Sequence, residues 1–358
     1  MSFDIASIDK NFKIETNIER EKLKFYDVKV APVKLYGVWH DGESYRRVPK
    51  DVAENTSPEL VTSSLKTAGG RIRFITDSPY VVIKAFYPFI TVFGHMPRAG
   101  TSGFDLYVNE GGREIYKKSL FPPNNTDLSF DAVFDFPDSR ERLITINFPL
   151  YNPLNELYLG IHSDSKIKHA PDYTVKLPIV SYGSSITQGG CASRPGNSYQ
   201  AMLSRRYDAD FTNLGFSGVA RGEAAIRNYI ASLPMSAFIF DYDYNAPTPE
   251  YLKETHKPFY EAVRKTHPDI PILMMGHPEF HSNDMVVKRN AVVKETYDYA
   301  LLNGDKNVYY IHSRELFALC EDGGTVDGVH PTDFGFRSMA EAMAKILDKL
   351  FEVKSEQF

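Results

Sequence analysis

The sequence predicts a two-domain protein in which an all-β sandwich or jelly roll precedes an α/β domain built on a parallel sheet. Its 358 residues are about twice the ~150 of a typical domain, so each half can bury a core of its own. Short stretches rich in Val, Ile, Phe and Tyr fill the first half, and strand-like and helix-like segments alternate in the second. We expect a lead-in segment over residues 1–27, a β-domain over 28–165 and an α/β domain over 175–358.

The lead-in is charged and weakly patterned, with Glu19, Arg20 and Glu21 in succession. The β-domain contains six strand-like segments and no long helical pattern; the segments span residues 35–39, 71–76, 80–87, 104–108, 144–148 and 157–161. Turn-forming pairs such as Asp41-Gly42 and Gly111-Gly112 separate them. Many short strands without helices indicate a sandwich, an architecture shared by carbohydrate-binding modules and inert spacers.

A polar connector around Pro171 leads into the second domain. Strands are predicted near residues 175–182, 210–214, 237–242, 270–275 and 308–311, and helices near 197–206, 222–233, 249–266, 285–302 and 334–351. This alternation is typical of a parallel sheet covered by helices on both faces. Ligands of such sheets bind beyond the carboxyl ends of the strands.

The segment Gly183-Ser184-Ser185-Ile186-Thr187 follows the first of these strands. A strand that breaks into a glycine-flanked turn lifts a side chain off the end of a sheet, which is how a serine nucleophile is commonly exposed. We interpret Ser185 as that nucleophile. The alternatives are Ser184 in the same role, or an ordinary turn, since Gly and Ser are common turn residues.

A serine hydroxyl needs an imidazole base, and the imidazolium needs a carboxylate to orient it. Asp327-Gly328-Val329-His330-Pro331 supplies both groups shortly before the last predicted helix. Asp and His three residues apart can lie on one side of a single turn, where Gly328 permits a tight backbone and Pro331 can begin the helix. We therefore expect Asp327 and His330 to act with Ser185.

These blocks resemble those of the SGNH (GDSL-type) hydrolase family. Asn213-Leu214-Gly215-Phe216-Ser217-Gly218 is similar to its second block and Asp241-Tyr242-Asp243-Tyr244-Asn245 to its third, so all four blocks occur in the family's order. Two departures are that Ser184 replaces an Asp and that Asp243-Tyr244 replaces Gly-Gly before Asn245. Gly103-Phe104-Asp105-Leu106-Tyr107 matches the Gly-x-Asp-Leu-Tyr motif of β-domains that accompany one subgroup.

The resemblance implies a flavodoxin-like three-layer α/β domain and an acyl-enzyme mechanism on Ser185 that needs no metal or cofactor. It also implies an oxyanion hole formed by the backbone N–H groups of Ser185 and Gly218 and the side-chain amide of Asn245. The expected substrate is a small-molecule or carbohydrate ester, first of all an O-acetyl sugar. The alternatives are a lipid esterase or thioesterase with the same residues, and a glycan-binding protein whose hydrolase domain is inert.

Several residues have a second interpretation. Asp322 or Glu321 could replace Asp327 as the acid. Gly218 could be present only to allow a positive φ in the backbone, and Asn245 could cap a turn. His277 also follows a predicted strand, but no matching motif places an acid near it, so we do not expect it to be the base. His95 could reach the site from the β-domain, although a loop histidine is the preferred interpretation.

The composition excludes several classes of function. The net charge is −5 and Lys and Arg form no dense cluster, so nucleic-acid binding is not expected. No run approaches the ~18 apolar residues of a membrane span. The beginning of the chain lacks the pattern of a secretory signal, which predicts a cytoplasmic protein, or a secreted or periplasmic one if a leader has been removed. The oligomeric state is not indicated.

The two cysteines, Cys191 and Cys320, cannot form a disulfide framework. The resemblance places both in loops near the site, which leaves open either a single bridge or two free thiols. The ten histidines include no His-x-x-x-His pair within a predicted helix and the cysteines lack metal-ligand spacing, so the sequence predicts no metal site.

Overall fold

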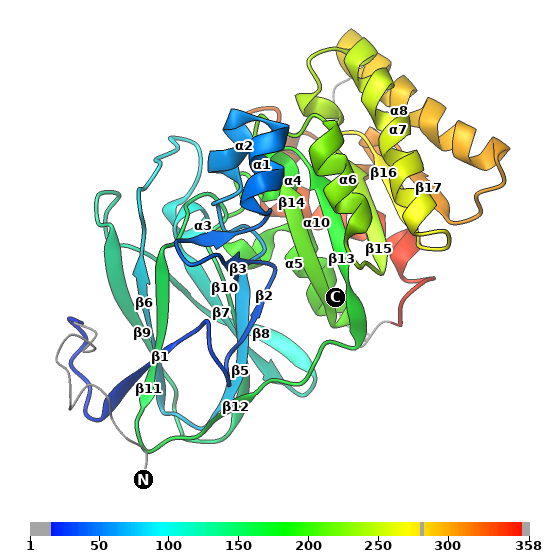
Figure 1. Cartoon of the computed structure of the whole chain (residues 1–358). Helices are drawn as coiled ribbons and strands as arrows, with labels where there is room; N and C mark the ends of the chain where they lie inside the picture. Colours follow the sequence, from blue (N-terminus) through cyan, green and yellow to red (C-terminus); the bar gives the residue numbers. More distant parts are fainter. Residues whose placement is uncertain (1–15, 280–282, 353–358) are drawn as a thin grey trace.

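The computed structural model describes residues 16–279 and 283–352. The first half of the chain forms two antiparallel sheets that face one another (Figure 1). One sheet has the order β1 (Leu23–Asp27), β11 (Glu156–His162), β6 (Tyr80–Phe86) and β9 (Ser129–Asp135). The other has the order β12 (Ile167–His169), β5 (Arg71–Thr76), β10 (Arg142–Asn147), β7 (Phe104–Glu110) and β8 (Arg113–Leu120), with β2 (Lys34–Tyr36) also paired to β5. A small hairpin joins β3 (Trp39–His40) to β4 (Tyr45–Arg46).

Alternating apolar side chains fill the space between the two sheets. Ile72 and Phe74 of β5 and Leu159 and Ile161 of β11 belong to one buried cluster. A strand directs every second side chain to the same face, so this spacing lets both sheets bury one face against the other. The predicted β-sandwich is confirmed.

The lead-in predicted over residues 1–27 extends too far. Leu23–Asp27 forms the edge strand β1, which pairs with β11 from Leu23 opposite His162 to Asp27 opposite Tyr158. The charged composition around Glu19 conceals this strand, because an edge strand needs only one apolar face. Residues 1–15 of the lead-in lie outside the described residues. The sequence pattern also misses β8, β9 and β12, and the short helices α1 (Lys50–Thr56), α2 (Pro58–Ser63) and α3 (Arg98–Thr101).

The second half of the chain forms a five-stranded parallel sheet. Its order is β14 (Ala209–Gly215), β13 (Val175–Gly183), β15 (Ala237–Asp241), β16 (Ile272–Met275) and β17 (Val308–Ile311). Numbered along the chain this order is 2-1-3-4-5, the flavodoxin-like arrangement that was expected. β14 and β15 flank β13 on opposite sides, and their parallel pairing places the carboxyl ends of all three strands side by side.

Helices cover both faces of this sheet (Figure 1). One face packs against α6 (Ala224–Ser232), α7 (Pro249–Thr266) and α8 (Asp284–Leu302), and the other against α5 (Tyr199–Tyr207) and α10 (Asp333–Leu347). Shorter helices are α4 (Ser185–Gln188), α9 (Ser313–Leu316) and the 3-10 turns η3 (Pro195–Asn197), η4 (Asp243–Asn245) and η5 (Glu321–Gly324). No helix within 16–279 and 283–352 is long and apolar enough to cross a membrane.

The two halves share a buried interface. Ala53 of α1 and Leu60 of α2 lie in the same apolar cluster as Ile226 of α6, so a segment of the β-half completes the core of the α/β half. Arg47 is 1% exposed and donates to the carbonyl oxygens of Ser63 and Lys66 on one side and of Asn213 and Gly215 on the other, at 2.6 to 3.1 Å. A buried cation is tolerated only when such bonds replace its hydration. Arg47 thus ties the β-half to the carboxyl end of β14.

Candidate active site

Ser185 is the first residue of α4, immediately beyond β13. Ser184 caps the helix because its side chain accepts a hydrogen bond from the N–H of Ile186 at 3.2 Å. A Cβ at Gly183 would lie 1.8 Å from Oδ1 of Asp241, so only glycine allows the strand to end this close to its neighbour. As the first helical residue, Ser185 has no carbonyl one turn before it to accept its N–H.

His330 connects the predicted nucleophile to the predicted acid. Its Nε2 lies 2.9 Å from Oγ of Ser185, and its Nδ1 lies 2.8 Å from Oδ2 of Asp327. Ser185 and His330 are separated by most of the second half of the chain. The structure therefore brings together the three residues predicted as a catalytic triad, with the imidazole between hydroxyl and carboxylate.

Asp327 is held by its own turn. Its Oδ1 accepts the backbone N–H groups of Val329 at 3.0 Å and of His330 at 2.8 Å. Partial burial alone would raise the pKa of Asp327, but these bonds and the bond from the His330 ring outweigh it and lower the pKa to about 2. Gly328 has φ +85, the left-handed conformation that favours glycine in so tight a turn. Asp327 is thus ionised at neutral pH, and neither Asp322 nor Glu321 occupies its place.

The predicted oxyanion residues follow the neighbouring strands. Gly183 pairs with Gly215 of β14 and with Asp241 of β15, so Ser185, Gly218 and Asn245 leave the sheet at the same level. Gly218 has φ +78, and its N–H donates to no described residue. The Oδ1 of Asn245 is buried without a partner in the described chain. Of these two groups only the N–H of Gly218 is a donor, and a donor left free here can stabilise a developing oxyanion.

The β-half contributes to the nucleophile turn. The hydroxyl of Tyr151 donates to the carbonyl oxygen of Ser185 at 3.0 Å. The side chain of Gln188 donates to the carbonyl of Leu150 at 2.9 Å and accepts the N–H of Ser217 at 3.0 Å. One glutamine therefore links the β-half, α4 and the turn that carries Gly218. Tyr151 was not predicted from the sequence, because no local pattern indicates contact with a turn in another domain.

Asp241 lies beneath the same turn. It is 4% exposed, accepts hydrogen bonds from Thr187 and, at 3.4 Å, from Tyr199, and burial keeps its pKa well above the usual range. It supports the turn from below and does not face the reacting groups.

His95 reaches the site, contrary to the preferred interpretation. It lies in the connection between β6 and α3, and its ring centre is 5.5 Å from that of His330. The thiol of Cys191 donates to the carbonyl of His95 at 3.7 Å. Both cysteines are free thiols. Cys191 therefore lies beside the triad, whereas Cys320 is buried in the cluster that contains Phe317 and Phe336.

His277 has an acidic partner that the sequence analysis did not identify. Its Nδ1 lies 3.1 Å from Oδ2 of Asp243, and its backbone N–H donates to Oδ1 of Asp243 at 3.0 Å. The ring of Tyr244 lies 4.7 Å from that of His277. Asp243 and His277 follow the adjacent strands β15 and β16, a neighbourhood that appears only when the strand order is known. The pair supports the turn that carries Asn245.

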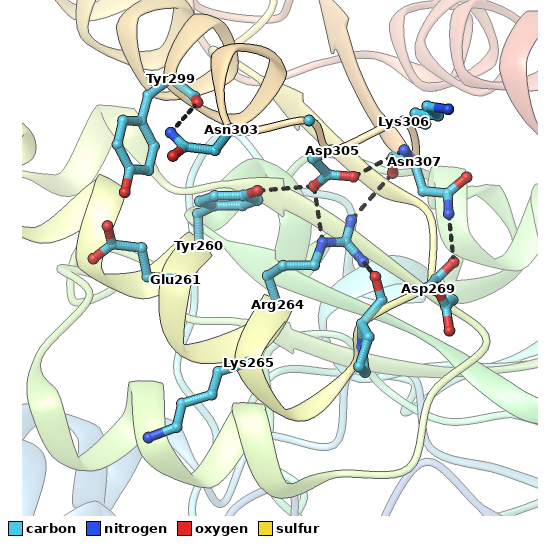
Figure 2. Close-up of a pocket in the computed structure, with 12 residues that line it drawn as sticks. Tyr260, Glu261, Arg264, Lys265, Asp269, Tyr299, Asn303, Asp305, Lys306 and Asn307 are labelled. Atoms are coloured by element: carbon cyan, nitrogen blue, oxygen red, sulfur yellow. Dashed lines mark hydrogen bonds and ion pairs between the residues drawn. The ribbon is translucent and has the colours of Figure 1, made fainter.

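A separate surface hollow of about 590 Å³ lies between α7 and α8 (Figure 2). Asp269 and Asn307 line it just before β16 and β17 begin. The hollow therefore lies at the amino ends of the strands, whereas Ser185 lies at the carboxyl ends. Arg264 donates to Asp305 at 2.8 Å and to the carbonyls of His267 and Ile270. These charges hold the end of α7 to the following loops. We therefore assign the chemistry to the carboxyl ends of the strands.

Comparison with known proteins agrees with this geometry. Residues 176–348 match the model of the GDSL-like lipase/acylhydrolase family. Residues 23–167 match the GxDLY model, the N-terminus of SGNH-hydrolase-type esterases. The second half of the chain is a GDSL-like lipase/acylhydrolase domain. This SGNH-type esterase carries the subgroup's β-domain as well, so the predicted resemblance is confirmed for both halves. No curated protein matches the esterase in sequence.

Solved structures resemble the esterase over nearly its whole length. A Bacteroides ovatus protein described as a GDSL-like lipase is 29% identical, with a TM-score of 0.83 over 93% of this chain and 100% of that one. A salicylyl-acyltransferase from a tetracycline biosynthetic pathway is 16% identical, with a TM-score of 0.75 over 93% and 98%. A family two carbohydrate esterase from Clostridium thermocellum, solved with cellohexaose, is 16% identical, with a TM-score of 0.57 over 80% and 94%. The last two likenesses concern the fold alone.

Proposed function

We propose that this protein hydrolyses small acyl esters, first of all O-acetyl groups on carbohydrates, through an acyl-enzyme on Ser185. The observation that carries the proposal is the continuous contact from Ser185 Oγ through His330 to Asp327, at 2.9 and 2.8 Å. Nucleophile and base are within the reach needed for proton transfer.

The mechanism follows from these positions. As Ser185 Oγ attacks the acyl carbon, Nε2 of His330 takes the hydroxyl proton, and ionised Asp327 stabilises the imidazolium. The negative charge on the carbonyl oxygen meets the N–H groups of Ser185 and Gly218 and the amide of Asn245, each donor contributing roughly 2.7–4 kcal/mol in comparable sites. His330 then protonates the leaving alcohol. Water, activated by the same ring, releases the acid and restores the Ser185 hydroxyl.

The carbohydrate ester is supported by architecture. The family two carbohydrate esterase solved with cellohexaose shares the fold, including most of the β-half. A fold is compatible with many substrates, so the acetyl sugar remains a proposal to be tested at the site.

A longer acyl chain is the second candidate, and exposed apolar side chains favour it. Val326 and Phe334, on either side of His330 in the sequence, are 48% and 52% exposed, and Val92, in the connection that carries His95, is 59% exposed. Apolar side chains near a reacting centre can bind an alkyl group. Relative rates on acetyl and octanoyl esters, together with acetate release from acetylated sugars, separate the two candidates. Preference for the octanoyl ester would favour the lipid substrate.

The triad is tested by replacing its hydroxyl. We expect Ser185→Ala to lower kcat on p-nitrophenyl acetate by at least about 10⁴-fold, because no acyl-enzyme can form. Ser184→Ala tests the alternative nucleophile, and Ser181→Ala, a buried serine of the preceding strand β13, is the matched control; both should retain most of the rate. Full activity of Ser185→Ala would disprove the mechanism, whereas an unaltered protein that neither reacts with a fluorophosphonate probe nor hydrolyses the ester would favour an inert binding protein.

A further inference from the structure

Three potential metal ligands from distant parts of the chain meet beside the triad. One ring nitrogen of His95, one of His330 and Sγ of Cys191 all lie within 4.8 Å of one another. They come from the connection between β6 and α3, the turn after α4 and the loop before α10. Two imidazoles and a thiolate form a ligand set that suits Zn²⁺ and similar thiophilic cations.

The orientation of His330 suits metal binding. Its Nδ1 faces Asp327 at 2.8 Å, which leaves the lone pair of Nε2 directed away from the carboxylate. Metal-binding histidines commonly donate their other ring N–H to a carboxylate, which fixes the ring and makes the ligating nitrogen more basic. The same Asp327–His330 pair that activates a serine nucleophile can therefore also present Nε2 of His330 to a metal ion.

Cys191 occupies a strained position at this cluster. Its φ is +71, in the left-handed region where glycine is favoured, although two glycines directly precede it. Non-glycine residues held in that region cost on the order of 1–3 kcal/mol and gather at functional sites. The side chain is 6% exposed and lies against His95, whose own exposed loop position lets it move toward an ion.

We propose that Zn²⁺, or a cation of the same chemistry, binds between Cys191 Sγ, His95 and Nε2 of His330 and thereby switches off the esterase. Ligands around a tetrahedral zinc ion lie roughly 3.5 Å apart, so the three ligand atoms, which lie within 4.8 Å of one another, must draw together by up to about an ångström. Water or Ser185 Oγ completes the coordination. Binding occupies the lone pair that would otherwise accept the Ser185 proton.

The protons balance in this step. A cysteine binds zinc as the thiolate, so the ion displaces the thiol proton of Cys191 to solvent when the sulfur–metal bond forms. No redox partner is required. Inhibition rests on the proposed function, whereas binding does not.

The experiment separates binding from inhibition. Full-length protein is freed of metal with EDTA, dialysed and titrated with Co²⁺, whose bond to a thiolate gives a near-ultraviolet charge-transfer band, and then with Zn²⁺ by calorimetry. Cys191→Ser removes the sulfur ligand, and His95→Ala removes the imidazole of the β-half. Cys191→Gly also removes the sulfur ligand but places at this position a residue that adopts φ +71 without strain. Cys320→Ser and His169→Ala are the matched controls. The rate of each variant in EDTA is its own reference for inhibition.

We expect one ion per chain in the unaltered protein and in both controls, with the thiolate band present and p-nitrophenyl acetate hydrolysis at least tenfold slower at saturation. Both Cys191 variants should lose the band, and all three site variants should need at least tenfold more Zn²⁺ for equal inhibition. Equal binding by the unaltered protein and the Cys191 variants would overturn the site. Binding with the expected variant pattern but without inhibition would overturn the switch and leave the site. An unaltered protein that binds Co²⁺ but hydrolyses no ester would count against the proposed function alone.

Discussion

Asp327 has both oxygens committed within one turn. Oδ1 accepts two backbone N–H groups and Oδ2 faces Nδ1 of His330. The local sequence Asp-Gly-Val-His is sufficient to build this arrangement, which is why the pair could be predicted without the fold. The Ser185–His330 contact could be predicted only through the order of the family's blocks.

We expect Asp327→Asn to reduce kcat by about 10⁴-fold with little change in KM, because an amide cannot hold the ring with Nε2 free to accept a proton. Steady-state kinetics on p-nitrophenyl acetate measure the effect. Asp322→Asn, the alternative acid, is the matched control and should retain its rate. A loss confined to Asp322→Asn would show that the wrong carboxylate has been assigned.

Other residues of the site were beyond sequence reasoning. His277 and Asp243 follow different strands, and His95, Cys191 and His330 are separated by about a hundred residues or more. Searches for metal ligands rely on short spacings, and none of these groups has one. Such neighbours are created by strand order and by the docking of the β-half.

At the scale of elements, the GxDLY motif connects β7 to the loop beside the site. Asp105 is fully buried and accepts the amide of Asn147 at 2.8 Å and the N–H of Gly196 at 2.7 Å. Burial raises the pKa of Asp105 to about 6, although these bonds oppose the shift. The same loop reaches α10, because the N–H of Ser193 donates to Asp333 at 2.8 Å. The motif thus supports the loop that contacts α10 at Asp333, three residues after His330.

Asp105→Ala should destabilise the protein by about 1–3 kcal/mol, since the N–H of Gly196 and the amide of Asn147 lose their buried acceptor. Thermal unfolding measures the change, and kcat should fall with it because Asp333 lies three residues from His330. Asp135→Ala, an exposed carboxylate on β9, is the control and should shift the midpoint little. Equal midpoints for both variants would contradict the role of Asp105.

Element prediction succeeded where patterns are regular. The strand over residues 308–311 and the helix over 249–266 were placed at their observed ends, because the first is a short continuous apolar and aromatic run and the second a long amphipathic helix. Strands β1 and β8 escaped notice because their exposed faces carry charged residues and weaken the pattern. The boundaries of the two domains remain predictions.

At the scale of the whole molecule, acid stability depends on His256. This residue of α7 is 1% exposed, stacks on Phe240 at 4.3 Å, and has an Nε2 without a partner among the described residues. Burial lowers its pKa to about 3, although the charge of Asp243 partly opposes the shift. Because the folded-state pKa lies below the usual 6.5, its contribution to stability is present above pH 6.5 and is lost as pH falls toward 3.

We expect His256→Phe to lose less stability on acidification, by about 1.4 kcal/mol per pH unit between roughly pH 6 and pH 3. Urea unfolding at successive pH values measures this slope. His169→Phe, on an exposed strand, should behave like the unaltered protein. Identical slopes for the two variants would show that His256 is not the group that titrates.

The buried guanidinium of Arg47 limits how this enzyme can adapt to its substrate. Its donors engage carbonyl oxygens of both halves, so any rotation of one half against the other would strand a positive charge away from water. Clamshell closure around a ligand would carry this cost. A change of substrate preference during evolution is therefore easier in the loops that carry Ser185 and His330 than in the angle between the two halves.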